Sequence, residues 1–197
     1  MTSFPPAPPG TNDQLSPIRS SRPLVALQAV SFANGIPVHI GPVCLRPRFN
    51  NVATAPQPGP TRDDLTEGYG AEFTSEPDDR QRAPELAAWT IASAAALAVP
   101  GVASLAYFEE WGPRGIRSRS GTPYPVADAI DAITALAGLP LLYGESPDGL
   151  VWALGARTDA GAAALAANLG PSARDITIEV DGTLRQTTLP AGGWVSL

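Results

Sequence analysis

The chain has 197 residues, of which 44% are apolar and 16% charged, with a formal net charge of −6 at pH 7. This composition indicates a globular protein with one domain of ordinary size and room for a second small one. The acidic balance argues against a nucleic-acid partner, because phosphate binding needs an excess of clustered positive charge.

The first 20 residues are rich in Pro, Ser and Thr, and we expect a disordered leader because they contribute little to a core. They lack the cationic and apolar segments of a signal peptide. The longest apolar run, "AAWTIASAAALAV", is shorter than the roughly 20 residues that a membrane span needs. We therefore expect a soluble, cytoplasmic protein with no membrane partner.

Helix and strand patterns alternate from residue 21 to about 140. Helices are predicted in "SSRPLVALQAVSFANG", "RAPELAAWTIASAAALAVPG" and "VADAIDAITALAG", each followed or ended by glycine. Between them lie two apolar strands, 38–45 and 102–108. Strands without polar alternation are typical of parallel βαβ packing with both faces covered.

The pattern changes near residue 140. Short strands are predicted in "LVWALGA", "AALAANL", "ITIEVD", "TLRQTTL" and "GWVSL", with turn signals between them. The dipeptide Asp181-Gly182 is a strong hairpin signal. Residues 141–197 are therefore predicted to form a small antiparallel β domain.

Polar residues follow both apolar strands, where parallel α/β folds carry their chemistry. The first strand is followed by Arg46, Arg48 and Asn50, and the second by Glu109, Glu110 and Arg114. A glutamate can act as a general base, and arginine can bind a carboxylate through two hydrogen bonds. The residues alone leave open a structural network in which these arginines pair with Glu109, Glu110, Asp78 and Asp79.

The single histidine and the single cysteine have simpler interpretations. His39 alternates with Val38 and Ile40, and such a lone histidine is more often a hydrogen-bonded core residue than a catalyst. Cys44 is expected to be a small buried apolar residue, and a lone cysteine excludes an intrachain disulfide. The serine-hydrolase elbow, the P-loop, the zinc-protease motif and the dinucleotide-binding fingerprint are all absent from the sequence.

The stretches "VHIGPVCLRPRFNNVAT" and "DDRQRAPELAAWTIASAAALAVPGVASLAYFEEWGPRGI" together resemble the later part of the D-apionate lactonase family. The resemblance implies a glycosidase-like (β/α)8 barrel with flanking β domains that hydrolyses the lactone of a branched sugar acid. By this resemblance, Arg46, Arg48 and Asn50 match the elbow after strand seven, and Glu109 matches the acidic residue that ends strand eight. Arg114 matches the loop behind it. Glu110 and Trp111 depart from the small hydroxyl residues expected there.

A whole barrel needs roughly 250 residues, and the resemblance covers only its last two βα units. The expected fold is therefore α/β, with a partial (β/α)8 barrel over 21–140 followed by a small antiparallel β-sandwich-like domain over 141–197. We expect the apolar inner face of so few strands to remain open, with Val43, Leu45, Leu105 and Tyr107 exposed. The partner would then be a separate barrel half or a second copy of the chain.

The resemblance implies a lactone hydrolase in which Glu109 activates water or a substrate hydroxyl. Arg46, Arg48 or Arg114 would stabilise the developing oxyanion of a sugar-acid lactone. No metal or organic cofactor is implied. The alternative is a non-catalytic remnant or interaction module that packs on a barrel partner. A glycoside hydrolase comes third, because that chemistry needs two carboxylates around one bond and the strand ending at Arg46 offers none.

Overall fold

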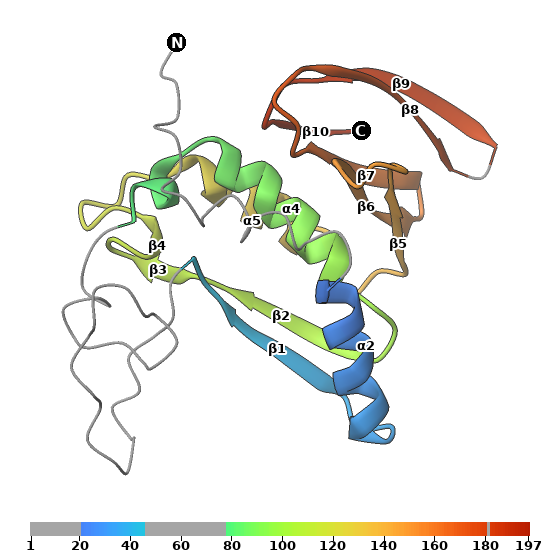
Figure 1. The fold of residues 1–197 in the computed structure, drawn as a ribbon, viewed down its shortest axis with the longest axis horizontal. Coiled ribbons are helices and arrows are strands. Elements are labelled where there is room, and N and C mark those ends of the chain that lie inside the picture. The colour runs from blue at the N-terminus through green and yellow to red at the C-terminus, as the bar shows by residue number, and fades with distance from the viewer. Residues whose placement is uncertain (1–20, 46–77, 181) are drawn as a thin grey trace.

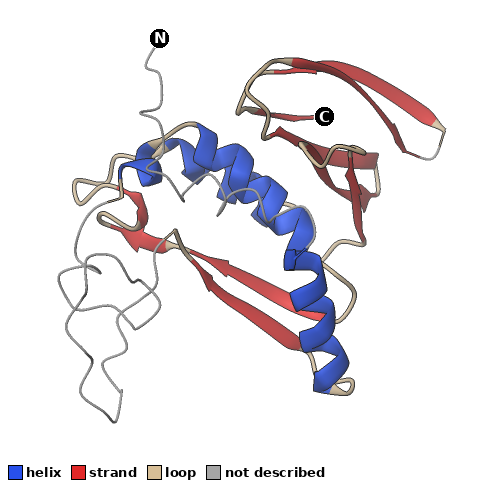
Figure 2. Ribbon diagram, in the orientation of Figure 1, coloured by secondary structure: helices blue, strands red, loops and turns tan. Residues whose placement is uncertain are grey.

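The computed structural model describes residues 21–45, 78–180 and 182–197. The predicted leader, residues 1–20, lies outside this part of the chain. In chain order the elements are α2 (Ser21–Ala33), β1 (Val38–Val43), the 3-10 helix η2 (Asp79–Arg82), α4 (Glu85–Leu97), β2 (Val102–Tyr107), β3 (Glu109–Trp111), β4 (Gly115–Arg117), α5 (Pro125–Thr134), β5 (Leu141–Glu145), β6 (Val151–Thr158), β7 (Gly161–Asn168), β8 (Arg174–Val180), β9 (Thr183–Leu189) and β10 (Trp194–Ser196). Figure 1 labels them, and Figure 2 distinguishes helices from strands.

Proline and glycine set the bounds of the three predicted helices, which are confirmed. A proline lies in or just before the first turn of each helix, where its fixed φ suits the helix and its missing N–H costs nothing. These prolines are Pro23, Pro84 and Pro125. A glycine with positive φ lies beyond each helix, at Gly35, Gly101 and Gly138. Glycine adopts this left-handed conformation without the penalty that a Cβ would bring, so the chain can turn there.

Strands β1 and β2 pair in parallel, as the apolar pattern predicts. Val38 lies opposite Val102, and Val43 lies opposite Tyr107, so both strands end at the same edge. Helix α4 connects them and covers one face of the pair (Figure 1). This is the βαβ unit expected from the sequence, with β1 ending at Val43 rather than at Leu45.

The expected exposure of the apolar face of the β1–β2 pair is wrong. The four apolar side chains expected to be exposed instead pack against the core beneath α4: Val43, Leu45, Leu105 and Tyr107. The opposite face is open in the described residues and carries small or polar side chains. His39 is exposed there, and its Nδ1 lies 2.8 Å from the Ser104 hydroxyl. The hydrogen bond agrees with the expectation for His39, but its placement in the core was wrong because α4 covers the other face. Cys44 is half-buried rather than fully buried.

The antiparallel strands expected after residue 140 are present, together with β5, which the sequence pattern did not indicate. One sheet has the order β10-β7-β6-β5, and all its neighbours are antiparallel. Strands β8 and β9 form a separate hairpin whose turn contains Gly182, with a φ of 77°. The hairpin packs over the sheet through a small apolar cluster that includes Val151, Ala166 and Leu189 (Figure 1).

Helix α4 lies at the centre of the molecule and is buried on every side. All residues from 86 to 97 are buried, which explains why this helix is apolar around its whole circumference. Its neighbours are α2, α5 and β2 on one side and β6 and β7 on the other. Trp152 and Leu154 of β6 belong to the same core cluster as Ile91 of α4. The core is therefore continuous across residue 140, the predicted limit between two domains.

Within the described ranges, no helix is both long enough and apolar enough to cross a membrane.

Candidate functional site

The chain leaves β2 through a residue in an unusual conformation. Phe108 has a φ of 54°, in the left-handed region that residues with a side chain seldom adopt. Its ring is buried, and its backbone N–H donates to the Val43 carbonyl at 3.0 Å. Packing and this hydrogen bond hold the conformation, which interrupts the strand and turns the chain toward Glu109. Strained residues of this kind cluster at functional sites.

The loop after Phe108 is closed tightly by its two glycines. The Glu109 N–H donates to the Arg114 carbonyl at 3.1 Å, and the Gly115 N–H donates to the Gly112 carbonyl at 3.0 Å. A Cβ on Gly115 would lie 2.6 Å from the carbonyl carbon of Trp111, which is backbone and has no room to move aside. Gly112 has a φ of 89° but open space around it. The "GPRG" sequence thus fixes a compact loop.

The side chain of Gln81 stabilises this loop through a hydrogen bond. Its side chain is 2% exposed, and its Nε2 donates to the Gly115 carbonyl at 3.0 Å. The short helix η2 that carries Gln81 is capped by Asp78, whose Oδ1 accepts from the Arg80 N–H at 3.1 Å. Asp78 also binds the Arg80 guanidinium, and this hydrogen bond raises the pKa of Arg80. Asp78 is therefore the N-cap of η2 and fixes the start of the helix that carries Gln81.

The structure brings Glu109 and Arg114 together. The Arg114 Nη2 lies 3.2 Å from the Glu109 Oε1, and the two side chains are 27% and 31% exposed, so solvent and small solutes reach the pair. The pair lies where β2 ends, beside the end of β1. Chemically, it offers a carboxylate that can accept a proton and a guanidinium that can donate hydrogen bonds to an oxyanion.

The remaining predicted site residues, Arg46, Arg48 and Asn50, lie outside the described residues. Their approach to Glu109 therefore stays a prediction. The sequence left open a structural network of arginines and carboxylates, and among the described residues the ion pair between Arg114 and Glu109 belongs to it. The pairing of Asp78 with Arg80 was not expected.

Two contributors to this region were missed by sequence reasoning. Phe108 was assigned to the strand, and nothing in its neighbours indicates a positive φ. Gln81 contacts Gly115 across 34 positions of sequence, and no local pattern predicts such a contact. The two glycines of "GPRG" were the signal that a tight loop follows Glu109.

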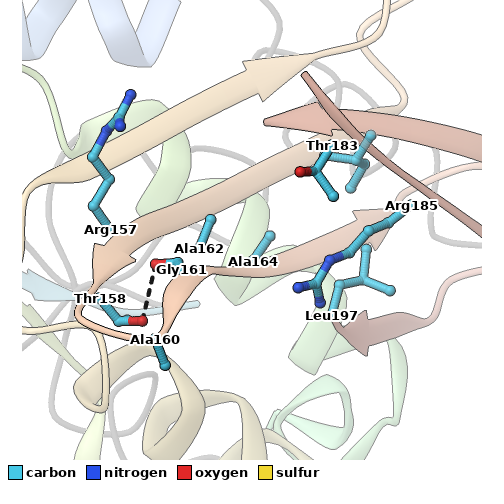
Figure 3. Close-up of a pocket in the computed structure, with 10 residues that line it drawn as sticks. Arg157, Thr158, Ala160, Gly161, Ala162, Ala164, Thr183, Arg185 and Leu197 are labelled. Carbon is cyan, nitrogen blue, oxygen red and sulfur yellow. Dashed lines mark hydrogen bonds between the residues drawn. The ribbon is translucent and has the colours of Figure 1, made fainter. Parts of the chain in front are cut away.

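A separate groove of about 380 Å³ lies in the antiparallel region, where the end of β6 and the start of β7 meet the β8–β9 hairpin (Figure 3). Arg157 and Arg185 line it, and the Thr158 hydroxyl donates to the Gly161 carbonyl at 2.9 Å to close the turn at its edge. None of the predicted site residues takes part. Among the described residues, no three His, Cys, Asp or Glu side chains gather as a metal site would require.

Most of the chain matches the model of a known protein family. Residues 20–138 match the family model described as "D-apionate lactonase, TIM barrel domain". A search of curated proteins found no match. The matched segment begins just before α2, contains β1, α4, β2 and the loop that carries Glu109 and Arg114, and ends after α5. Because this segment makes up more than half of the chain, the protein belongs to the D-apionate lactonase family.

Proposed function

We propose that this protein takes part in hydrolysing the lactone of a sugar acid, with Glu109 as the catalytic base. The observation that carries the proposal is the Glu109–Arg114 pair at the carboxyl end of β2, within the segment that matches the family. In barrels of this kind the reacting groups lie at the carboxyl ends of the strands. The strained Phe108 and the tight glycine loop support the same position, because both fix the direction of Glu109.

We further propose that β1 and β2 are the last two strands of an eight-stranded barrel. Parallel pairing, the connection through α4 and the packing of α4 against β2 and against the helices α2 and α5 support this arrangement. The open face that carries His39 and Ser104 would then line the barrel interior. The sheet of β5, β6, β7 and β10 with the β8–β9 hairpin over it would form a sandwich-like addition.

In the proposed reaction, Glu109 takes a proton from water as the water oxygen attacks the lactone carbonyl carbon. Negative charge develops on the carbonyl oxygen, and the Arg114 guanidinium donates hydrogen bonds to it. The ring C–O bond then breaks, and the leaving oxygen takes the proton from Glu109. The product is an open sugar acid, and no cofactor is consumed.

Arg46, Arg48 and Asn50 are proposed to hold the substrate. The sugar hydroxyls and the new carboxylate of the product need several hydrogen-bond donors, and arginine offers two parallel ones to a carboxylate. In this proposal Pro47, whose ring fixes its own φ, would limit the conformational entropy that the two arginines lose on binding. These residues would act from the end of β1 while Glu109 acts from the end of β2.

Substitution of Glu109 tests this function. Hydrolysis of a panel of branched and linear sugar-acid lactones is followed by base uptake at constant pH. Loss of a general base typically costs a factor of about 100 to 10,000, so we expect kcat of Glu109→Gln to fall at least about 100-fold. Glu110→Gln is the matched control, because Glu110 is the exposed neighbour and loses the same charge. Equal activity of the two variants would remove Glu109 from the mechanism.

The alternative function is a non-catalytic interaction module. One observation favours it: helix α2 leaves large apolar side chains exposed, among them Phe32 at 88%. If wild-type protein binds a barrel partner but neither the chain nor the complex turns over any lactone, this alternative replaces the catalytic proposal.

A further inference from the structure

The β8–β9 hairpin reverses its apolar pattern near its tip. Side chains alternate between the two faces of a strand, and β9 pairs with β8 without a bulge. Leu189 is 0% exposed and packs in a cluster with Val151 and Ala166 of the sheet, so the face of β9 that carries it points inward. Arg185 lies on that same face, whereas Leu184 lies on the outer face and is 62% exposed. An arginine therefore occupies an inner position that normally carries an apolar side chain where two sheets pack.

The cross-strand partner of Arg185 shows what this inner position faces. Arg185 lies directly opposite Ile178 of β8, and both residues line the groove of about 380 Å³ between the hairpin and the sheet. The sheet contributes Ala162 and Ala164 of β7 to the lining. Figure 3 shows the Arg185 side chain extending from the hairpin toward Leu197. This space, called the hairpin groove below, thus has largely apolar walls with a guanidinium set into one of them.

No carboxylate among the described residues pairs with Arg185. Within the described ranges its guanidinium forms no hydrogen bond or ion pair, and the side chain is exposed to solvent. None of the described residues that line the hairpin groove is acidic, and Asp159, in the turn between β6 and β7, is not among them. Arg157 of β6 adds a second positive charge to the lining. A cleft lined by charges of one sign concentrates their field, so the hairpin groove attracts anions.

Two threonines supply hydroxyl groups to the hairpin groove. Thr158 ends β6 and Thr183 begins β9. The Thr158 hydroxyl donates to the Gly161 carbonyl at 2.9 Å, so its oxygen can still accept a hydrogen bond. The Thr183 hydroxyl can both donate and accept. The volume of the groove lies within the range of about 300–1,000 Å³ that is usual for small-molecule sites.

We propose that the hairpin groove binds a hydroxylated organic carboxylate of monosaccharide size, such as a hexuronate. Arg185 would bind the carboxylate through two parallel hydrogen bonds. The two threonines would bind hydroxyl groups, and the apolar face of the ring would pack against Ile178 and the alanines of β7. A phosphate ester is a poorer match, because phosphate sites use the N–H groups of a helix N-terminus, and this groove is lined by strands and their turns. The inference does not rest on the proposed reaction, since neither Glu109 nor Arg114 lines the groove.

The test uses the full 197-residue chain and sodium D-glucuronate, with D-glucose as the equivalent ring without a carboxylate. Affinity is measured by saturation-transfer difference NMR, which observes the ligand and therefore tolerates association of the protein. Arg185→Gln removes the charge from the groove, and Ala162→Leu narrows the groove without changing any charge. Arg119→Gln is the matched control, because Arg119 is an exposed arginine outside the groove. Inorganic phosphate is titrated as a competitor.

We expect D-glucuronate to bind and D-glucose to bind at least about 10-fold more weakly. The dissociation constant for D-glucuronate should rise at least about 10-fold in Arg185→Gln, because a hydrogen bond to a charged group contributes about one to two decades of affinity. Ala162→Leu should weaken binding as well, and Arg119→Gln should leave it unchanged. Circular dichroism of each variant establishes that the fold is retained.

Four results would overturn the inference. They are no binding of D-glucuronate, equal affinity for D-glucose, tighter binding of phosphate, and equal affinity of Arg185→Gln and Arg119→Gln. The last result would leave Arg185 only the role of an inward-pointing charge that discourages pairing between strand edges.

The catalytic loop and the hairpin groove are separated by two further variants. A ligand held at the catalytic loop would lose affinity in Arg114→Gln and keep it in Arg185→Gln, and this outcome would also overturn the inference. Glu109→Gln should bind D-glucuronate in the groove like the wild type. Loss of turnover without loss of this binding therefore concerns only the proposed function, and loss of binding in Arg185→Gln concerns only the groove.

Discussion

Replacing Ile91 by alanine tests whether the two sides of residue 140 share one core. Ile91 is 0% exposed in the middle of α4, in one cluster with Trp152 and Leu154 of β6. Removing such a side chain costs the transfer free energy and leaves a cavity, in total about 2–5 kcal/mol. Because α4 is enclosed by secondary structure on all sides, little collapse is available, and we expect about 3 kcal/mol. For a chain of this size that lowers the unfolding midpoint by roughly 6–12 °C.

The assay is denaturant unfolding combined with amide hydrogen exchange read separately in β2 and in the β6–β7 hairpin. A continuous core predicts that protection falls by the same free energy in both segments. Leu184→Ala is the control, since Leu184 on β9 is 62% exposed and its loss should change stability by less than about 1 kcal/mol. If protection falls in β2 but does not change in β6 and β7, the reasoning is refuted. Two separate unfolding transitions, of which only one shifts in the variant, would likewise show that the two parts of the chain unfold independently.

Three further predictions follow from the geometry. Gly115→Ala should lower turnover more than Gly112→Ala, because the former places a Cβ 2.6 Å from a backbone atom, whereas the latter meets open space and adds only the strain of a positive φ; equal effects in steady-state assays would argue against a rigid loop. Hydrogen bonds from Ser146 and the Leu150 N–H, together with Arg174, lower the pKa of Asp148. The ionised Asp148 therefore contributes fully to the free energy of unfolding above about pH 4, and this contribution is lost as the pH falls below that value. The stability difference between wild type and Asp148→Asn in urea titrations should therefore shrink on acidification, and a difference independent of pH would contradict this. The chain should self-associate in solution, because large apolar side chains such as Phe32, at 88%, are exposed, and a monomer at every concentration in analytical ultracentrifugation would contradict this.

Local signals in the sequence were sufficient for the helices and for the parallel strands. Pro84, Pro125 and the glycines after each helix act on their own backbone, so their effect is visible without tertiary structure. The meeting of Glu109 and Arg114 could be predicted as well, because a tight loop after a strand brings its two ends together.

The faces of the strands could not be predicted in the same way. Alternation divides Leu105 and Tyr107 from Ser104 and Ala106, but it does not say which set a helix covers. That depends on where α4 lies, and α4 is apolar all round, so its own sequence gives no direction. The same limit applies to the contact of Gln81 with Gly115, which depends on how two distant segments pack.

The position of α4 bears on how this protein can have evolved. The segment that defines the family ends at residue 138, yet the helix at its centre relies on Trp152 and Leu154, which lie beyond that point. Recombination that joined a foreign sequence after residue 138 would leave one side of α4 in water. The barrel segment and the strands that follow it are therefore expected to be inherited as a pair, and substitutions along β6 and β7 to covary with those on α4.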